Sequence, residues 1–359
     1  MAVFYVLLLV PILMQNMTIR GLLRDRQKRN RAALKFFFVF LTLLIGLRHE
    51  TIGNDTYNYK CFFVNFDRIA WDRLWKVDLE IGFCYFNKLI TIITKDPQAF
   101  LMIAAIITSA LIWPTYKRLC TDVSLTIVLF CIMSTFVMMF SGVRQMLAIG
   151  IGFIAYGFTR QKKLLLYILT CLVAFSVHTS AFMLAFMYPL YHAKVTKKWL
   201  YVVVPLLALC FVFNRQIFGS LTLILEKYTK YDGAIESTGA YTMLVLFGMF
   251  LVFSFLIPDE RKLDKETTGL RNFLLLTFAL QMFAPLHTTA MRMGYYYMIY
   301  VPLLLPKIIE VRSKRWNQVA ILGRHVMVAF FLVYFFLNAS SGNGGLNVFP
   351  YHFFWEIVG

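Results

Sequence analysis

The chain has 359 residues, of which 60% are hydrophobic and only 15% are charged. Soluble domains carry about 25% charged residues, so this composition excludes a soluble enzyme, a disordered chain and a nucleic-acid-binding domain. The formal net charge of +18 is then expected to report topology, because the cytoplasmic loops of membrane proteins collect Lys and Arg.

The first apolar run, Met1–Met14, has no basic residue before it and no small-residue cleavage site after it. It is therefore predicted to be a retained helix and not a cleaved signal peptide. The basic cluster Arg20–Lys35 follows and is expected to remain in the cytoplasm, which places the start of the chain outside.

Further apolar runs are long enough to cross about 30 Å of hydrocarbon. With the first run they predict an all-α polytopic integral membrane protein with about 12 transmembrane helices, within a range of about 11–14. Residues 1–359 are expected to form a single polytopic membrane domain. The predicted spans after the first are Leu34–Leu47, Phe100–Tyr116, Val123–Phe140, Val143–Phe158, Leu164–Val177, Ser180–Tyr191, Trp199–Phe213, Tyr241–Ile257, Leu270–Pro285, Met291–Pro306 and Val319–Leu337.

Two apolar stretches are ambiguous. Ile81–Thr94 contains Asn87 and Lys88, so we expect an interfacial or re-entrant helix there. Leu164–Tyr191 is broken only by His178, which predicts two short helices that meet at this residue on the outer side. This topology places about two thirds of the 36 Lys and Arg residues in the cytoplasm and leaves the outer face almost neutral. The predicted outer segments are the loops 48–99 and 214–240 and the tail 338–359.

Polar residues that suit chemistry collect at the predicted outer edge of the membrane. Three predicted helices that run inward from this edge begin near basic or titratable side chains. A helix N-terminus already carries about half a positive charge, so basic groups there are unfavourable unless an anion lies among them. Helix N-termini and arginine forks both suit phosphate, which predicts an outward-facing site for a lipid-linked diphosphate. The candidate residues are Arg48, Asp55, Glu80, Arg144, His178, His287 and Arg292.

Several of these residues also have a structural interpretation that the sequence leaves open. Arg48 suits an interfacial anchor, and Arg144 suits a contact with lipid headgroups. His178 and His287 suit hydrogen-bonded corners, and Asp55 suits the cap of a turn. Their coincidence at one edge favours the functional interpretation more than any single residue does.

Metal binding has little support in the sequence. The outer acidic pair Asp55 and Glu80 is a thin basis for a metal that bridges phosphates, so none is expected. No cysteine spacing is typical of a metal site. Cys61 and Cys84 lie in one outer segment, and the sequence leaves both a disulfide and two free thiols open.

Four motifs follow one another along the first half of the chain. Residues 48–63 read RHETIGNDTYNYKCFF, and residues 80–83 read EIGF. Residues 142–148 read GVRQMLA, and residues 178–181 read HTSA. In order and spacing, across roughly Leu34–Tyr191, this part of the chain resembles the EpsG family. Members of that family belong to exopolysaccharide and O-antigen clusters and are similar to Wzy polymerases.

The resemblance implies a GT-C-like glycosyltransferase of the bacterial cytoplasmic (inner) membrane, with its active site facing the periplasm or exterior. Such a polymerase transfers the growing glycan from undecaprenyl diphosphate to the non-reducing end of a new lipid-linked repeat unit. Donor and acceptor are both undecaprenyl-diphosphate-linked oligosaccharides. The resemblance implies no cofactor and no nucleic acid, contact with membrane lipid, and a flippase and a chain-length regulator as candidate partners.

This chemistry gives roles to the candidate residues. A glycosyl diphosphate already has a good leaving group, so the enzyme must stabilise its developing charge, activate the acceptor hydroxyl and exclude water. The residues assigned to the diphosphate and the substrate are Arg48, Glu80, Arg144, Gln145 and Arg292. The candidate bases are Asp55, His178 and His287, among which the sequence does not decide.

Three other functions remain open. An O-antigen ligase would bind the same lipid-linked glycan outside. A chain that resembles the ligases usually has a large outer loop late in its sequence, whereas the largest predicted outer loop here is early. A flippase or exporter predicts a cationic cavity through the membrane, whereas the charges here lie at one edge. An acyltransferase would need an inward-facing histidine.

Overall fold

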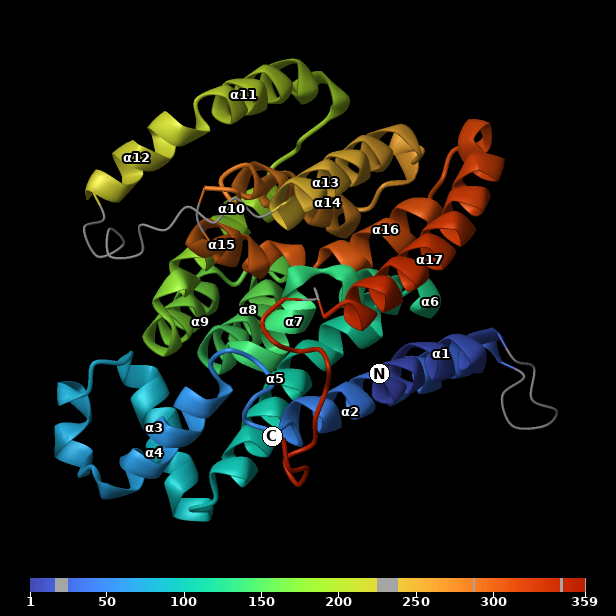
Figure 1. Cartoon of the computed structure of the whole chain (residues 1–359). Helices are drawn as coiled ribbons and strands as arrows, with labels where there is room; N and C mark the ends of the chain where they lie inside the picture. The colour runs from blue at the N-terminus through green and yellow to red at the C-terminus, as the bar shows by residue number, and fades with distance from the viewer. Residues whose placement is uncertain (17–24, 225–237, 287, 343–344, 359) are drawn as a thin grey trace. The chain divides into compact units, whose positions relative to one another are not determined.

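The computed structural model of the chain is helical throughout the residues that it describes, which are 1–16, 25–224, 238–286, 288–342 and 345–358 (Figure 1). Within these ranges there are no strands, and only two isolated β-bridges occur, between Arg48 and Phe353 and between Pro258 and Arg312. The all-α prediction is therefore confirmed.

The chain divides into two compact units. Unit 1 comprises residues 1–185 and 321–359, and unit 2 comprises residues 186–320. The helices of unit 1 are α1 (Ala2–Asn16), α2 (Arg26–Gly46), α3 (Thr56–Arg68), α4 (Ile81–Ile93), α5 (Pro97–Leu119), α6 (Val123–Ile132), α7 (Ser134–Ser141), α8 (Val143–Arg160), α9 (Leu164–Val177) and most of α17 (Asn317–Ser340). The helices of unit 2 are α10 (Met187–His192), α11 (Leu200–Val212), α12 (Asn214–Ile224), α13 (Thr238–Leu256), α14 (Lys265–Gln281), α15 (Thr288–Met298) and α16 (Val301–Glu310).

Helix α5 is the long central helix of unit 1 and packs against α2, α3 and α8. The Asp96 carboxylate caps its first turn by accepting from the Gln98 and Ala99 amides, and Pro97 occupies the first helical position. Lys117 and Arg118 lie in its last turn, where the helix dipole favours cations. These signals explain why a 23-residue apolar segment begins and ends where it does.

Long apolar helices make the protein membrane-embedded. Among the described residues, α5 and the segment Lys314–Ser340 are long and apolar enough to cross a bilayer by themselves. Two bent pairs, α6 with α7 and α11 with α12, pass the same test together, with bends of 65° and 74°. Shorter apolar helices include α1, α4 and α9. By length and composition, the described helices include two to four that could each span a bilayer. The predicted number of about 12 spans stays a prediction.

Several predicted spans are interrupted helices. The predicted span Met291–Pro306 is divided into α15 and α16, because Pro302 lacks an amide hydrogen and its ring would clash with the Met298 carbonyl of a continuous helix. The predicted span Ser180–Tyr191 is a 3₁₀ segment, Thr179–Phe186, followed by the short α10. The predicted outer loop 214–240 contains α12.

The break predicted at His178 is confirmed. Helix α9 ends at Val177, and His178 has an extended backbone with φ −155° and ψ 125°. The ambiguous stretch Ile81–Thr94 forms helix α4, and its two polar residues are buried. The Asn87 amide donates to the Phe83 carbonyl at 2.8 Å. Lys88 Nζ donates to the carbonyls of Phe66 and Asp67 at the end of α3, so these polar side chains fasten α4 to its neighbour.

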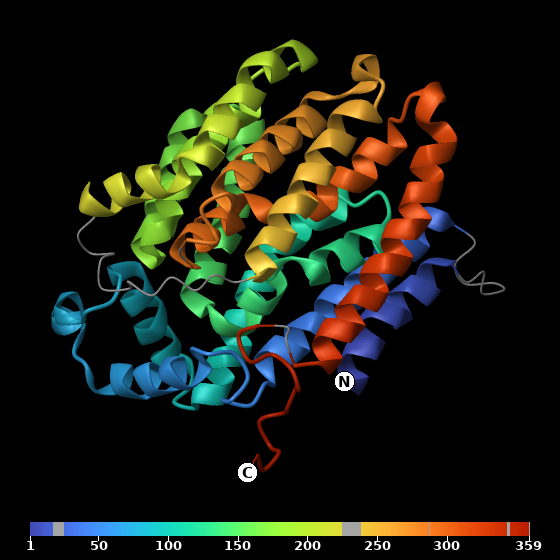
Figure 2. The ribbon, with the colours of Figure 1, turned by 45° about the horizontal axis from the view of Figure 1, so that its top comes forward.

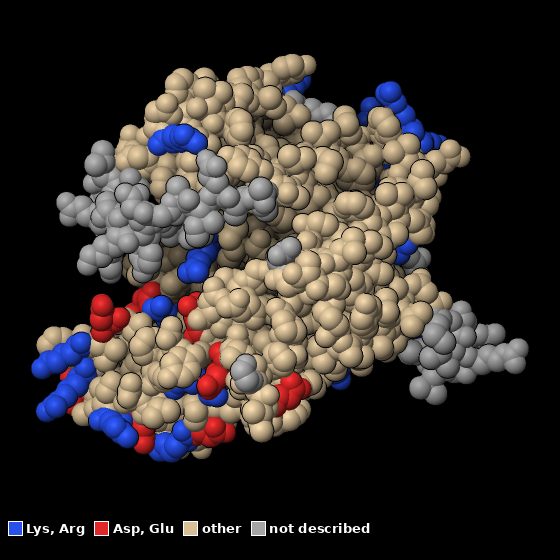
Figure 3. All heavy atoms as spheres, viewed as in Figure 1, with Lys and Arg blue, Asp and Glu red and all other residues tan. Residues whose placement is uncertain are grey.

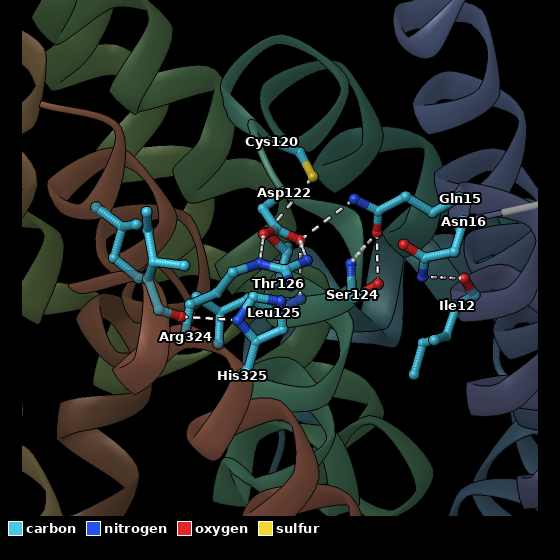
Figure 4. A network of polar contacts seen from close by, with 12 residues as sticks. Ile12, Gln15, Asn16, Cys120, Asp122, Ser124, Leu125, Thr126, Arg324 and His325 are labelled. Atoms are coloured by element: carbon cyan, nitrogen blue, oxygen red, sulfur yellow. Dashed lines mark hydrogen bonds and ion pairs between the residues drawn. The ribbon is translucent and has the colours of Figure 1, made fainter. Parts of the chain in front are cut away.

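A polar network joins α1, α6 and α17 in unit 1 (Figure 4). Asp122 caps α6 by accepting from the Leu125 amide at 3.3 Å. The same carboxylate accepts from both Nε and Nη2 of Arg324 on α17 and from Gln15 of α1. The side-chain Oε1 of Gln15 in turn accepts from the Ser124 amide at 2.7 Å. A single carboxylate therefore connects three helices that are distant in the sequence.

Replacing Arg324 by Met should destabilise unit 1 by about 2–4 kcal/mol, because the largely buried Asp122 carboxylate then loses its partner. The side chains of Arg324 and Asp122 are 21% and 14% exposed, which keeps the expected loss below that of a fully buried pair. The Asp122→Asn/Arg324→Met double variant removes the uncompensated charge and keeps a capping side chain, so it should be more stable than the single variant. Thermal unfolding in detergent measures both, and a double variant no more stable than Arg324→Met would contradict the prediction.

Candidate functional site

Charged side chains of both signs gather over the part of unit 1 that contains α3 and α4 (Figure 3). Three segments that are far apart in the sequence meet at the start of α4. They are Glu80 before α4, Arg144 in the first turn of α8, and His178 after α9. We call these three residues the Glu80 cluster.

Glu80 is the centre of the cluster. Its Oε2 accepts from Arg144 Nη1 at 2.6 Å, and its Oε1 contacts His178 Nδ1 at 2.8 Å. The Thr179 amide donates to the same Oε1 at 3.2 Å. The side chains of Glu80, Arg144 and His178 are 12%, 26% and 21% exposed. The carboxylate is thus almost covered, while the arginine and the histidine remain accessible to a ligand.

Close backbone packing brings Glu80 to His178. A Cβ atom added at Gly82, two residues after Glu80, would lie 2.4 Å from Ser176 Oγ and 2.7 Å from the Ser176 carbonyl oxygen. Only glycine permits this approach of the first turn of α4 to the last turn of α9. The EIGF and HTSA motifs are therefore two sides of one helix contact.

Aromatic rings support the arginine. Arg144 Nε donates to the Tyr59 hydroxyl at 3.4 Å, and its guanidinium lies 6.0 Å from the Tyr59 ring centroid and 5.9 Å from that of Phe83. Cation–π contacts of this kind orient a guanidinium without using its remaining N–H groups. The sequence analysis did not assign Tyr59, although its spacing of four from Asp55 places both on one helix face.

The electrostatics keep Glu80 ionised. Burial alone would raise the pKa of the Glu80 carboxyl, but the hydrogen bond with His178 and the positive charge of Arg144 outweigh burial and hold this pKa well below its usual range. Burial raises the pKa of the Tyr59 hydroxyl, and the nearby Arg144 opposes this effect only in part. At neutral pH the Glu80 carboxylate is therefore ionised beside the Arg144 guanidinium, and the neighbouring Tyr59 phenol is protonated.

The first motif forms a tight loop against the end of α7. Gly53 has φ +82°, and a Cβ there would lie 2.2 Å from the Phe140 carbonyl oxygen. The Ser141 hydroxyl donates to Asp55 Oδ2 at 3.2 Å. Asp55 also precedes α3 as its N-cap residue, without a side-chain capping bond. The loop thus places Asp55 beside the turn that leads into α8 and Arg144.

The other predicted site residues have different surroundings. Arg48 is fully buried, with its guanidinium bonded to Thr56 and to the Ile45 carbonyl, and it does not touch the Glu80 cluster. Gln145 is buried in α8. Arg292 is half-buried in α15 of unit 2. His287 lies outside the described residues, so its predicted role is untested.

The structure bears on two questions that the sequence left open, namely whether Cys61 and Cys84 form a disulfide and whether acidic side chains gather around a metal. Cys61 is exposed and Cys84 is buried, and both are free thiols in the structure. Across the described ranges, no three His, Cys, Asp or Glu side chains gather in a way that suits a metal ion. The expectation of metal-independent chemistry remains a prediction.

The fold and the cluster define a class, namely a helical membrane protein with a partly open Glu–Arg–His site at a junction of helix ends. The chain belongs to the EpsG family, whose model matches residues 32–353. The match extends the resemblance seen in the first half of the chain to residue 353, within the C-terminal tail. No curated protein and no solved structure matches the chain.

Proposed function

We propose that the protein is a bacterial polysaccharide polymerase, a glycosyltransferase that acts on lipid-linked glycans at the outer face of the cytoplasmic membrane. The observation that carries the proposal is the Glu80 carboxylate held between Arg144 and His178. Membership of the EpsG family supports a polymerase-type function in exopolysaccharide or O-antigen synthesis. The donor is the growing glycan on undecaprenyl diphosphate, and the acceptor is a new lipid-linked repeat unit.

The histidine has the geometry of a general base. Because the Glu80 carboxylate can only accept, the contact places a proton on His178 Nδ1, and in the neutral form of the ring the lone pair is then on Nε2. An orienting carboxylate behind a histidine is the arrangement by which hydroxyl groups are activated in many enzymes. We assign His178 Nε2 to the acceptor hydroxyl, and Asp55 to its alignment.

The arginine has the geometry of an anion ligand. Arg144 commits Nη1 to Glu80 and Nε to Tyr59, and it is a quarter exposed at the start of α8, where the helix N-terminus adds positive potential. We assign it to the diphosphate. Arg292 and His287 remain further candidates for the diphosphate and the base.

The proposed reaction is a single displacement whose atoms balance. The acceptor hydroxyl oxygen bonds to the anomeric carbon of the donor glycan as the bond from that carbon to the diphosphate oxygen breaks. The hydroxyl proton passes to His178, and undecaprenyl diphosphate leaves with its negative charge stabilised by Arg144. Neither oxidation nor a nucleotide is needed.

The test is reconstitution of the purified protein in liposomes with a synthetic undecaprenyl-diphosphate-linked repeat unit. A ladder of products on a gel is expected from the wild type. Arg144→Ala and His178→Ala should each reduce polymer by at least about 10²-fold, as loss of an anion ligand or a general base does. Arg160→Ala at the other end of α8 and His325→Ala on α17 are the matched controls and should retain the ladder.

Three outcomes would contradict the proposal. Transfer of one intact glycan to a non-glycan acceptor lipid, without a ladder, would indicate a ligase. Movement of the lipid-linked unit across the vesicle without a covalent product would indicate a flippase or exporter. Wild-type polymer from well-expressed Arg144→Ala and His178→Ala variants would remove the site assignment.

A further inference from the structure

Arg48 lies just after the C-terminus of α2, where the last backbone carbonyls of the helix have hydrogen-bond partners. Four consecutive carbonyls there, which a helix leaves without internal partners, all accept hydrogen bonds. The Leu44 carbonyl accepts from the Tyr351 hydroxyl at 2.7 Å, and the Ile45 carbonyl accepts from Arg48 Nη1. The Gly46 carbonyl accepts from Gln98 Nε2 at 2.7 Å, and the Leu47 carbonyl accepts from the Phe354 amide at 2.9 Å.

The burial of the Arg48 charge has a structural explanation. Burial lowers the pKa of Arg48 to about 10, which leaves the guanidinium charged at neutral pH. No carboxylate pairs with it among the residues that the structure describes. The negative end of the α2 dipole and the Ile45 carbonyl supply the compensation instead. Arg48 Nη2 has no hydrogen-bond partner among the described residues, but the cavity that Arg48 lines with Ile45 and Leu101 is about 10 Å³, which holds about one water molecule and no diphosphate.

The other arm of Arg48 leads to the motif loop. Arg48 Nε donates to the Thr56 hydroxyl oxygen at 3.0 Å. The Thr56 hydroxyl also lies 2.5 Å from the Ile52 carbonyl and 3.1 Å from the Phe140 carbonyl, and Thr56 is fully buried. One side chain thus connects the end of α2, the start of α3 and the end of α7. Arg144 follows three residues after α7 ends at Ser141.

A segment near the end of the chain covers this junction. We call residues 347–354 the strap, and Figures 1 and 2 both show it beside the end of α2. The Gly53 amide donates to the Asn347 carbonyl at 3.2 Å, and the His49 amide donates to the His352 carbonyl at 2.9 Å. Arg48 and Phe353 form an antiparallel bridge. The strap therefore holds the motif loop by its backbone, which encloses Arg48.

We propose that Arg48 is a positioning residue and not a ligand of the substrate: enclosed by the strap, it fixes the loop that carries Asp55 and the turn that carries Arg144. This inference rests on the proposed polymerase function for its kinetic consequence. Its structural part, that Arg48 is closed off from the lipid diphosphate, stands independently and has its own measurement.

The kinetic test uses Arg48→Lys, which keeps the charge but cannot donate through Nε and Nη1 together. A positioning role predicts a fall in kcat of about 10-fold or more, with KM for the lipid-linked unit within about twofold of wild type. Thr56→Val should reproduce this fall, because its buried hydroxyl oxygen is the acceptor for Arg48 Nε. The double variant should be little worse than either single variant, since both break one connection. A raised KM at unchanged kcat in Arg48→Lys, or full activity in Thr56→Val, would overturn the proposal.

The independent test is arginine modification by phenylglyoxal, mapped by mass spectrometry on the full-length protein. Arg48 should stay unmodified, like the buried and paired Arg271, while Arg144, which is about a quarter exposed, reacts. Tyr351→Ala should open the strap and make Arg48 reactive. Added undecaprenyl diphosphate should protect Arg144 and leave the wild-type Arg48 signal unchanged. Wild-type modification of Arg48 at the rate of Arg144, or its protection by undecaprenyl diphosphate, would contradict the proposal even if no polymer were ever detected.

Discussion

Replacing Glu80 by glutamine is expected to reduce polymer formation by about 10²–10⁴-fold, the range found when a base loses its orientation and an anion ligand loses its place. Glutamine has the same shape, but its amide presents one acceptor where the carboxylate presents two charged oxygens. The amide oxygen can accept from only one of Arg144 Nη1 and His178 Nδ1 and carries no full charge, so one substitution affects both side chains. The gel-ladder assay in liposomes measures the loss.

Glu50→Gln is the matched control for this substitution. Glu50 also pairs with a cation, Lys60, at 3.0 Å, but its side chain is 40% exposed. It lies in the same predicted outer segment, 48–99, and a loss below about twofold is expected because exposed ion pairs contribute little. Equal activity losses in Glu50→Gln and Glu80→Gln would show that the segment as a whole, and not the Glu80 cluster, is sensitive.

The pH dependence of stability in wild type and Glu80→Gln separates the effect of the Glu80 charge from an effect on packing. Because the pKa of Glu80 is lowered by folding, its stabilising effect is fully present above the unfolded pKa of about 4.3 and is lost as the pH falls through the folded value. The stability difference between wild type and Glu80→Gln should therefore be constant from neutral pH to about pH 5 and shrink below about pH 4. Thermal unfolding at several pH values measures this difference.

Gly53→Ala is expected to have the largest effect on folding, a loss of about 2–5 kcal/mol. The positive φ costs about 1–2 kcal/mol for any residue with a Cβ, and overpacking adds about 1–3 kcal/mol. The new atom would lie 2.2 Å from the Phe140 carbonyl oxygen and 2.8 Å from its carbon, both of which belong to the backbone and cannot rotate away. Thermal unfolding in detergent and the yield of folded protein report the loss.

Gly345→Ala separates the two contributions. Gly345 has φ +78°, close to the +82° of Gly53, but no atom lies within 4 Å of a Cβ built there. This control should lose only the conformational part, about 1–2 kcal/mol. Equal losses in both variants would mean that the contact of the motif loop with Phe140 contributes nothing.

Local patterns in the sequence predicted the parts of the fold that depend on neighbours along the chain. The break at His178 follows from one polar residue in an apolar run, and α4 follows from the apolar period of residues 81–94. The division of one late span into α15 and α16 was also visible in principle, since Pro302 is a local signal. Hydropathy averages over such a residue, which is why the span was predicted as continuous.

The residues of the Glu80 cluster were all candidates from the sequence, but the contacts between them were not predictable from it. Glu80, Arg144 and His178 were all candidates, yet the contacts of Glu80 reach across 64 and 98 residues of sequence, which no local pattern reports. Glu80 was assigned to the substrate, and in the structure its almost covered carboxylate contacts Arg144 and His178, so its role stays a prediction. Arg48 was assigned to the site because it ends a predicted span, and its burial, which involves a segment far along the chain, was not predictable from local patterns.

The strap has a consequence for the order in which the protein is made. Tyr351 and Leu44, which share a hydrogen bond, are 307 residues apart in the sequence. Contacts of such long range form late, because the intervening chain must first be ordered. During synthesis, the motif loop would therefore lack its contacts with the strap until almost every helix has been made. A chain that ends before the strap would contain Glu80, Arg144 and His178 but would lack the backbone contacts that hold the motif loop. We expect such a chain to be inactive.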